Sequence, residues 1–334
     1  MLAQGARFTT KWSHTPIVVE GGLGEGANGT VYLVRTPLGQ AAMKVCNASA
    51  DVAMEWALLT SLGQGANAFP KPMLIDDGPP EAPFFYIMEW IPGQSLGKVL
   101  AQGDFALVSK VFEKVLDALV DLHQTGYAFC DLKPENVIVT TGRDVSIRFV
   151  DVGGITRFGR AVRQYTPLCD RAFFGMGSRK AEPSYDLFAL LLGLVTSAMK
   201  EKTDDLSKLD PARRLRLLEQ TMQRFPVEAV PALLKSLQSG KVTTALELKK
   251  RWSDLPDAKK QIQPQHAGKA RTSRRQQTAS QQTGAGVNRS SKGRARPRHR
   301  SRMDWTERLM WWSLGGAGIA SAAAWAVLMG WLPS

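Results

Sequence analysis

The spacing of apolar residues changes in kind along this chain, and that change constrains its fold more than any other feature. From about Ile17 to Leu74, short apolar runs such as VYLVR and AAMKV alternate with Gly-rich turns, which predicts strands, and DVAMEWALLTSL has helical spacing. From Leu96 onward LGKVLAQ, VFEKVLDALVDLHQ, SYDLFALLLGLVTSAM and PARRLRLLEQTM are helical, while NVIVT and VSIRFVD are strand-like. We therefore predict an α+β fold, in which a small sheet with one helix precedes a larger helical part.

A different composition follows Trp252. Gln, Ser, Thr, Gly and Arg dominate as far as Met303 and aromatic residues are missing, so this segment is unable to bury a core. The Lys and Arg residues between Ala258 and Met303, with no Asp or Glu among them, equal in number the net charge of +13. The excess positive charge therefore lies in one predicted disordered linker.

The segment Leu309–Leu332 contains no charged residue and is long enough to cross roughly 30 Å of hydrocarbon. A buried core helix is the alternative, but Trp residues near both ends favour a membrane span. By the positive-inside rule, the basic residues before it predict that the N-terminal part stays cytoplasmic. These residues are Arg294, Arg296, Arg298, Arg300 and Arg302.

The N-terminal region and the cysteines agree with a cytosolic domain. The start MLAQGARFTTKWSH lacks the apolar core of a secretory signal, so we expect no export of the folded part. Cys46, Cys130 and Cys169 are odd in number, far apart and without zinc-ligand spacing, which favours a reduced compartment.

A Gly-rich segment, LGEGANGTVYLV, has the spacing G-x-G-x-x-G-x-V that lets backbone approach nucleotide phosphates. Its positions are Gly24, Gly26, Gly29 and Val31. A dinucleotide-binding fingerprint would open a helix after the glycines, whereas TVYLV continues as a strand. We therefore predict a phosphate-covering hairpin.

Two charged residues follow this hairpin. Lys44 lies on an apolar strand, where it would pair with nucleotide phosphates, and Glu55 on the next helical stretch is the nearest residue to hold it. A solvated surface Lys and an exposed helix charge are the alternatives.

The strongest local pattern is CDLKPENVIV, in which Asp131, Lys133 and Asn136 have the spacing of a kinase catalytic loop. Asp131 would accept the proton of the attacking hydroxyl, Lys133 would neutralise charge on the transferring phosphoryl group, and Asn136 would hold one Mg²⁺. Asp151, in FVDVGG, would hold the bridging metal ion.

With Lys44, Asp131, Asn136 and Asp151 in this order, the chain resembles the Hanks-type protein kinases from about Ile17 to Leu255. The resemblance implies a bilobal kinase fold, ATP and Mg²⁺ as cofactors, and protein substrates. D-L-K-P-E-N is the form typical of serine/threonine kinases. The predicted organisation is a kinase domain at 17–255 (N-lobe about 17–91, C-lobe about 92–255), a linker at 256–308 and a transmembrane helix at 309–332.

The resemblance also implies the nucleotide pocket. YIMEWIPG resembles the hinge, with Met88 as gatekeeper, and SYDLFALLLGLV resembles the central helix of the larger lobe, whose Asp186 would support the catalytic-loop backbone. The implied nucleotide-binding residues are Leu23, Gly24, Gly26, Gly29, Val31, Ala42, Lys44, and the backbone of Glu89 and Ile91.

The chain departs from the family at three places. Phe129-Cys130 replaces the usual His-Arg, which removes the Arg that would read a phosphorylated activation loop, and Val152 replaces a Phe. CDRAF stands where Ala-Pro-Glu is usual. A pseudokinase scaffold that binds DNA or anionic lipid is therefore an alternative, but the retained catalytic residues favour catalysis.

A small-molecule phosphotransferase is a third possibility, because such enzymes share the catalytic Asp and the metal ligands on a related fold. The Gly-rich loop and D-L-K-P-E-N favour a protein substrate instead.

Four linker cations lie farther from the predicted span than the roughly 15–20 residues that the topology rule counts. They are Lys269, Arg271, Arg274 and Arg275. We expect them, with the Arg residues nearer the span, to contact DNA phosphates or anionic lipid without sequence preference. Clustering on such a surface would promote self-association and trans-autophosphorylation.

The expected location is a bacterial cell membrane, with a single span and a cytoplasmic kinase domain. Resemblance to a membrane kinase of spore-forming bacteria implies the forespore membrane and a link to sporulation.

Overall fold

The computed structural model describes residues 1–26, 28–62, 68–103, 105–199, 203–224, 227 and 229–256. All of them belong to one compact unit, Met1–Lys269. Most of the predicted linker and the whole predicted span lie outside the described residues. Within the described ranges, no helix has the length and apolar character needed to cross a membrane.

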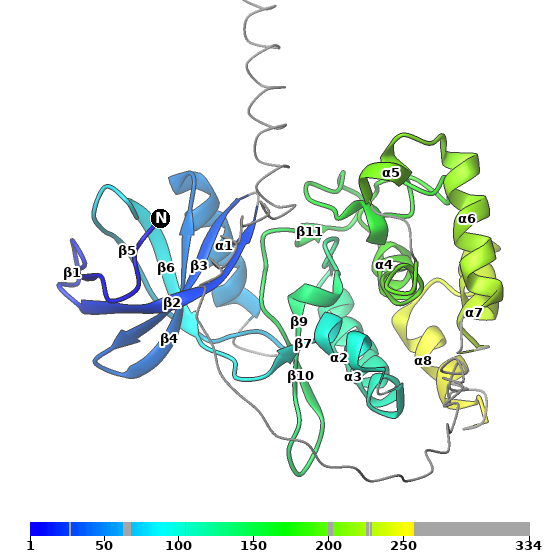
Figure 1. The fold of residues 1–334 in the computed structure, drawn as a ribbon, viewed down its shortest axis with the longest axis horizontal. Coiled ribbons are helices and arrows are strands. Elements are labelled where there is room, and N and C mark those ends of the chain that lie inside the picture. Colours follow the sequence, from blue (N-terminus) through cyan, green and yellow to red (C-terminus); the bar gives the residue numbers. More distant parts are fainter. Residues whose placement is uncertain are drawn as a thin grey trace, which may run out of the picture. The chain divides into compact units, whose positions relative to one another are not determined.

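The N-terminal part is a six-stranded antiparallel sheet with one helix, α1 (Ser49–Leu62), beside it (Figure 1). Its strands, in spatial order, are β1 (Arg7–Thr9), β2 (Pro16–Gly26), β3 (Gly29–Thr36), β4 (Gly39–Cys46), β6 (Phe84–Glu89) and β5 (Pro72–Asp77). The sheet starts at β1, before Ile17 where we expected the domain to begin, because so short a strand leaves no period-2 signal.

Alternation along β4 divides the sheet into two apolar faces. Ala41 and Met43 pack with Phe85 and Ile87 on one face. Ala42 and Tyr86 belong instead to the large core that also contains the buried α1 residues Val52 and Leu59. Since neighbouring residues of a strand point to opposite faces, Lys44 shares the Ala42 face, toward α1.

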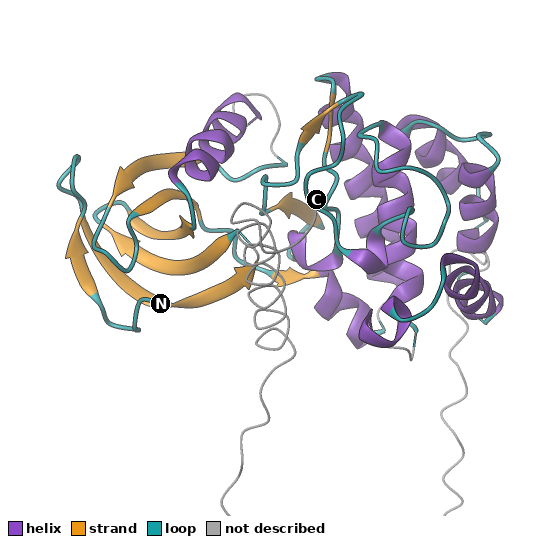
Figure 2. Cartoon of the chain, turned by 90° about the horizontal axis from the view of Figure 1, so that it is seen from above, coloured by secondary structure: helices purple, strands orange, loops and turns teal. Residues whose placement is uncertain are grey.

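The C-terminal part is mainly helical, and most of the helices gather there, away from the large sheet (Figure 2). Its helices are α2 (Leu96–Gln102), α3 (Phe105–Gln124), α4 (Pro183–Thr196), α5 (Thr203–Ser207), α6 (Pro211–Gln223), α7 (Ala229–Gln238) and α8 (Ala245–Ser253). Every residue from Tyr185 to Thr196 is buried, which makes α4 the central helix and explains its continuous apolar sequence.

Short strands and 3-10 helices of the C-terminal part hold the loops that carry the sequence motifs. They are β7 (Gln94–Ser95), β8 (Tyr127–Ala128), η1 (Pro134–Asn136), β9 (Val137–Thr140), β10 (Ser146–Phe149), β11 (Thr156–Arg157) and η2 (Pro167–Cys169). Strands β10, β9 and β7 form one small sheet, and β11 pairs with β8 in another. The loop between β8 and β9 carries CDLKPEN.

A backbone hydrogen bond and packed aromatic rings join the small lobe to this loop region. The Phe149 amide donates to the Ala68 carbonyl at 2.8 Å, and the Phe69 ring lies against Phe129 and Phe149 at centroid distances of 6.5 and 5.6 Å. These contacts fix the end of β10, which leads directly into Asp151.

Candidate active site

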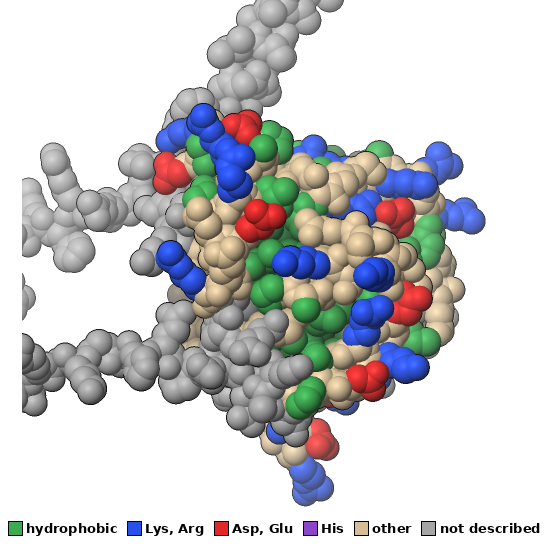
Figure 3. Space-filling view, turned by 90° about the vertical axis from the view of Figure 1, so that its right-hand side faces the viewer, with side chains coloured by type: hydrophobic (Ala, Val, Ile, Leu, Met, Phe, Trp, Pro, Cys, Tyr) green, Lys and Arg blue, Asp and Glu red, His purple; other side chains and the backbone are tan. Residues whose placement is uncertain are grey.

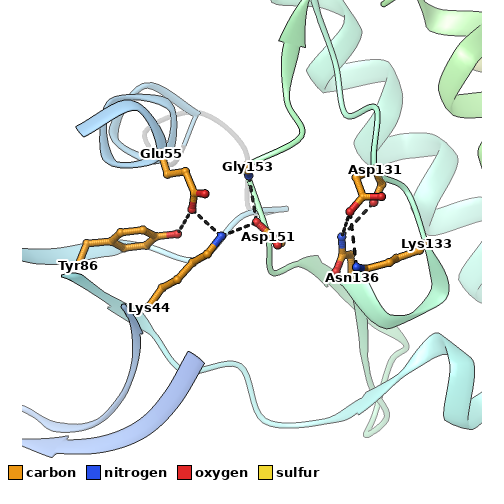
Figure 4. A network of polar contacts seen from close by, with 8 residues as sticks. All are labelled: Lys44, Glu55, Tyr86, Asp131, Lys133, Asn136, Asp151 and Gly153. Carbon is orange, nitrogen blue, oxygen red and sulfur yellow. Dashed lines mark hydrogen bonds and ion pairs between the residues drawn. The ribbon is translucent and has the colours of Figure 1, made fainter. Parts of the chain in front are cut away.

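Lys44 is buried at the centre of an ion-pair network. Its Nζ lies 2.7 Å from Glu55 Oε2 and 2.9 Å from Asp151 Oδ1, and the Tyr86 hydroxyl donates to the same Glu55 oxygen at 2.8 Å. Figure 4 shows these groups converging from β4, α1, β6 and the loop after β10. The surface alternative for Lys44 and Glu55 does not apply, since they are 4% and 0% exposed.

The electrostatics of this network favour the charged forms of Lys44 and Asp151. Burial by itself lowers the pKa of Lys44, but the carboxylates of Asp151 and Glu55 outweigh it and raise the pKa above its usual range. Burial by itself raises the pKa of Asp151, yet Lys44 and the Gly153 amide together hold that pKa below its usual value. Burial raises the pKa of Glu55, and Lys44 opposes this shift.

The second half of the site is the loop between β8 and β9. The Asn136 side-chain amide donates to the Asp131 carbonyl at 2.9 Å and approaches Asp131 Oδ2 at 3.4 Å, while Lys133 Nζ lies 3.6 Å from that same oxygen. In Figure 4 the Lys44 group lies on one side of Asp151 and this loop on the other. The three residues that the sequence placed by spacing are therefore in mutual contact.

Thr166 also touches the catalytic carboxylate, which the sequence analysis missed. Its hydroxyl donates to Asp131 Oδ1 at 2.8 Å across a large sequence separation. The local sequence signal is the Thr166-Pro167 pair: Pro is favoured at the first residue of a helix, so the pair marks the start of the short helix η2. Thr166 leaves Asp131 Oδ2 as the more lightly engaged oxygen.

Asp186, at the start of α4, holds the loop backbone. Its two oxygens accept the amides of Phe129 and Cys130 at 2.7 and 2.8 Å, and His123 Nε2 lies 2.9 Å from one of them. Cys130 adopts a left-handed backbone with φ of 67°, which is strained for a residue other than Gly. The fully buried Asp186 carboxylate stabilises that conformation directly before Asp131.

The departures from the usual family pattern have defined environments. Cys130, at the position of the missing Arg, packs in an apolar cluster with Ala128, Ala181 and Tyr185. In CDRAF, Arg171 pairs with Glu182 at 2.7 Å and Asp170 accepts from Arg179 and Tyr185. Paired side chains thus hold the CDRAF stretch against the residues that follow it.

The glycine hairpin lies next to the strand that carries Lys44, since Val31 of β3 pairs with Lys44 of β4. Gly24 pairs with Val31, and Gly26 pairs with Gly29 at the turn between β2 and β3. Gly29 has a φ of 149°, and a Cβ at this position would overlap the Val45 carbonyl oxygen, so the turn requires glycine. Leu23, at an irregularity in the strand pairing, remains 47% exposed.

The hinge follows β6 directly. Met88 is buried and pairs with Ala42 across the β4–β6 ladder, and the Glu89 amide donates to the Lys71 carbonyl at 2.8 Å. Ile91 follows after Trp90. Because the Glu89 amide is already bonded, the Glu89 carbonyl is the backbone group that an adenine ring would contact.

The residues fit Mg²⁺ with ATP. Asp151 Oδ1 accepts from Lys44 and from the Gly153 amide at 3.0 Å, whereas Asp151 Oδ2 and the side-chain oxygen of Asn136 accept no hydrogen bond from any described residue. Mg²⁺ prefers oxygen ligands and usually takes one or two carboxylates plus substrate phosphates. These two oxygens would hold the metal, and Lys44 would meet the phosphates.

A strand-rich lobe with a Lys–Glu pair, joined to a helical lobe with this catalytic loop, defines a protein kinase. The protein kinase domain family matches residues 17–203, more than half of the chain, and the chain belongs to the Hanks-type serine/threonine protein kinases. It is 35% identical over 269 residues to the serine/threonine-protein kinase YabT of Bacillus subtilis (strain 168), covering 77% of this chain and 75% of YabT.

More distant relatives agree. PknD, a serine/threonine-protein kinase of Mycobacterium tuberculosis, is 28% identical over 176 residues, which cover 49% of this chain and 26% of PknD. The solved structure of vaccinia related kinase 3 is similar in fold, with a TM-score of 0.55 at 15% identity, covering 76% of this chain and 90% of that one. The predicted family and the bilobal α+β kinase fold are therefore confirmed.

Proposed function

We propose that this chain is a catalytically active, Mg-ATP-dependent kinase that phosphorylates serine and threonine hydroxyls of proteins. The observation that carries the proposal is the double ion pair of Lys44 with Glu55 and Asp151, which joins the small lobe to the metal-binding aspartate. A scaffold without catalysis would have no need for a buried Lys held by two carboxylates, because desolvating such charges is costly.

The side chains divide the reaction between them. Bound Mg-ATP supplies the transferable phosphoryl group, and Asn136 and Asp151 would hold the metal. Lys44 would orient the phosphates, and Lys133, 3.6 Å from Asp131 Oδ2, would offset negative charge near the acceptor. The acceptor hydroxyl would give its proton to Asp131 Oδ2, since Oδ1 is engaged by Thr166.

Radiolabel transfer tests this proposal. The full-length chain with Mg-ATP and a generic protein acceptor should incorporate label on Ser and Thr, identified after acid hydrolysis, whereas Lys44→Met and Asp131→Asn should remain unlabelled although they fold. Substituting an aminoglycoside for the protein controls for small-molecule transfer. Label that persists in Asp131→Asn would refute the assignment of the base, and no label in the wild type would favour the scaffold alternative.

We further propose that 309–332 tethers the kinase to a bacterial membrane, with the active site in the cytoplasm, and that the basic linker binds DNA or anionic lipid. Support comes from the sequence: a charge-free apolar segment preceded by Arg residues. From the resemblance to a membrane kinase of spore-forming bacteria, we propose the forespore membrane as the particular site.

Autophosphorylation in trans would follow from clustering on that surface. Autolabelling should rise with duplex DNA or anionic vesicles at low salt and fall as salt increases, because counterion release drives such binding. Neutral vesicles are the control. A rate that is unaffected by both surfaces would remove this regulatory proposal and leave the kinase assignment intact.

A further inference from the structure

The activation segment, Gly153–Ala181, presents only positive charge to solvent. Its exposed charged side chains are Arg157, Arg160, Arg163, Arg179 and Lys180. Its single acidic residue, Asp170, is fully buried and accepts from Arg179 and Tyr185. We name these five cations the segment cations.

Backbone pairing brings two stretches of the segment together. The Ala181 amide donates to the Arg160 carbonyl at 2.8 Å and the Val162 amide to the Arg179 carbonyl at 2.9 Å, around an antiparallel bridge between Ala161 and Lys180. Residues distant in sequence thereby form one narrow basic surface. Like charges so placed repel one another within the screening length of about 8 Å in physiological salt.

Two of the segment cations have structural partners. The Arg163 guanidinium donates to the Ile155 carbonyl at 2.8 Å and contacts the Met54 sulfur on α1. The Arg179 guanidinium pairs with Asp170 and lies 3.9 Å from the Tyr165 ring centroid. Their contacts maintain the shape of the segment.

Arg157, Arg160 and Lys180 have no such role. Their side chains form no hydrogen bond or close ion pair with any described residue, and only Lys180 is near a carboxylate, that of Glu182. The stretch from Arg157 to Gln164 contains no Ser, Thr or Tyr, so no phosphate attached within it can neutralise Arg157 and Arg160. A bound anionic partner would relieve the repulsion.

The same segment reaches the catalytic centre. Thr166, three residues after Arg163, donates to Asp131 Oδ1 at 2.8 Å, and β11 pairs with β8, the strand that leads into Asp131. Three residues span at most about 11 Å, which is the reach of a few residues on either side of a phosphorylated hydroxyl. A partner on the segment cations would therefore lie beside the acceptor position.

We infer that the segment cations select acidic protein substrates, with Asp or Glu flanking the phosphorylated Ser or Thr. This inference rests on the proposed kinase function and names its substrate class. Its place next to Asp131 favours an acceptor peptide over nucleic acid as the partner. Charge complementarity of this kind acts on association and specificity at exposed positions.

Three versions of one peptide test the inference on the full-length protein: a single Ser flanked by Asp and Glu, by Asn and Gln, and by Lys and Arg. We expect the highest kcat/KM for the acidic peptide. The variant Arg157→Gln/Arg160→Gln/Lys180→Gln should lower that value about tenfold through KM, the effect of three exposed ion pairs. Added salt should reduce the preference of the wild type.

The matched control removes three exposed cations elsewhere, on α6, α7 and α8, with Arg216→Gln/Lys235→Gln/Lys250→Gln. Figure 3 shows one face of the molecule, on which Lys and Arg side chains lie among Asp and Glu. This control should keep the acidic preference, and thermal unfolding should match for all three proteins.

Equal use of the three peptides by the wild type, or an unchanged preference in the segment variant, would overturn the inference while the kinase function stands. Phosphorylation of no peptide and no protein would overturn both. Duplex DNA that binds the segment variant more weakly than the wild type, with peptide preference unaffected, would assign the surface to nucleic acid instead.

Discussion

Thr166 bonds the oxygen of Asp131 that does not face Lys133, and so limits how the catalytic carboxylate rotates. Thr166→Val removes this hydrogen bond at nearly constant volume. We expect kcat to fall about tenfold, since a hydrogen bond to a charged group contributes about 1.5 kcal/mol or more. The KM for ATP should change little, because Thr166 lies on the acceptor side of the site.

Steady-state kinetics with a peptide acceptor would measure this effect, and Thr166→Ser, which keeps the hydroxyl, is the matched control. A Thr166→Val enzyme with the wild-type kcat would mean that the contact does not position Asp131. Lys44 shows the same principle among buried residues, since its orientation depends on partners from α1 and the loop after β10.

At the scale of elements, the β2–β3 hairpin depends on one glycine. Gly29→Ala forces a Cβ against the Val45 carbonyl at a positive φ, so the free energy of unfolding should fall by more than about 1 kcal/mol. Gly24→Ala, where a Cβ meets nothing within 4 Å, should leave that free energy nearly unchanged. Thermal or urea unfolding without nucleotide distinguishes the two, and equal losses would contradict the steric argument.

The turn before β2 is tied to β5 through Asp76. Its carboxylate accepts the backbone amides of Trp12, Ser13 and Asp77 at 2.9, 2.8 and 2.7 Å. Burial by itself raises the pKa of Asp76, but the hydrogen bonds from Ser13, Trp12 and Asp77 outweigh it and lower the pKa from 3.8 to about 2. The ionised carboxylate therefore stabilises the folded state.

Because the folded-state pKa is depressed, this stabilisation is present above pH 3.8 and disappears as the pH falls toward 2. Asp76→Asn should lower the free energy of unfolding by about 2 kcal/mol at pH 7, and the difference from the wild type should shrink below pH 4. Urea unfolding across this range measures it, with the exposed Asp144→Asn as control for the loss of one negative charge. A difference independent of pH would contradict the ionic origin.

At the scale of the whole molecule, the folded domain extends past the residues that match the family, 17–203, through α8. The Trp252 ring of α8 lies 4.3 Å from Phe112 on α3 and is buried. Trp252→Ala should lower the free energy of unfolding by about 3–5 kcal/mol. Trp252→Phe should lose less, because the indole nitrogen bonds no described residue. If Trp252→Ala unfolded like the wild type, α8 would not be part of the cooperative core.

The elements whose apolar pattern continues over four or more residues could be predicted from the sequence. DVAMEWALLTSL corresponds to α1, and NVIVT to β9, because local spacing alone distinguishes period 3.6 from period 2. The two-residue strands β7, β8 and β11 were not expected, and neither were α7 and α8. Two residues carry no periodicity, and the ends of such strands are set by their partners.

By itself, the sequence determined the family and the residue types of the site, because catalytic chemistry requires Lys44, Asp131, Asn136 and Asp151 at spacings that chance seldom produces. Only the tertiary structure decided which of these groups touch. The Lys44–Asp151 pair, the Thr166–Asp131 bond and the pairing that gathers the segment cations join residues far apart in the chain. Such contacts depend on strand register and helix packing, which form only when the whole domain folds.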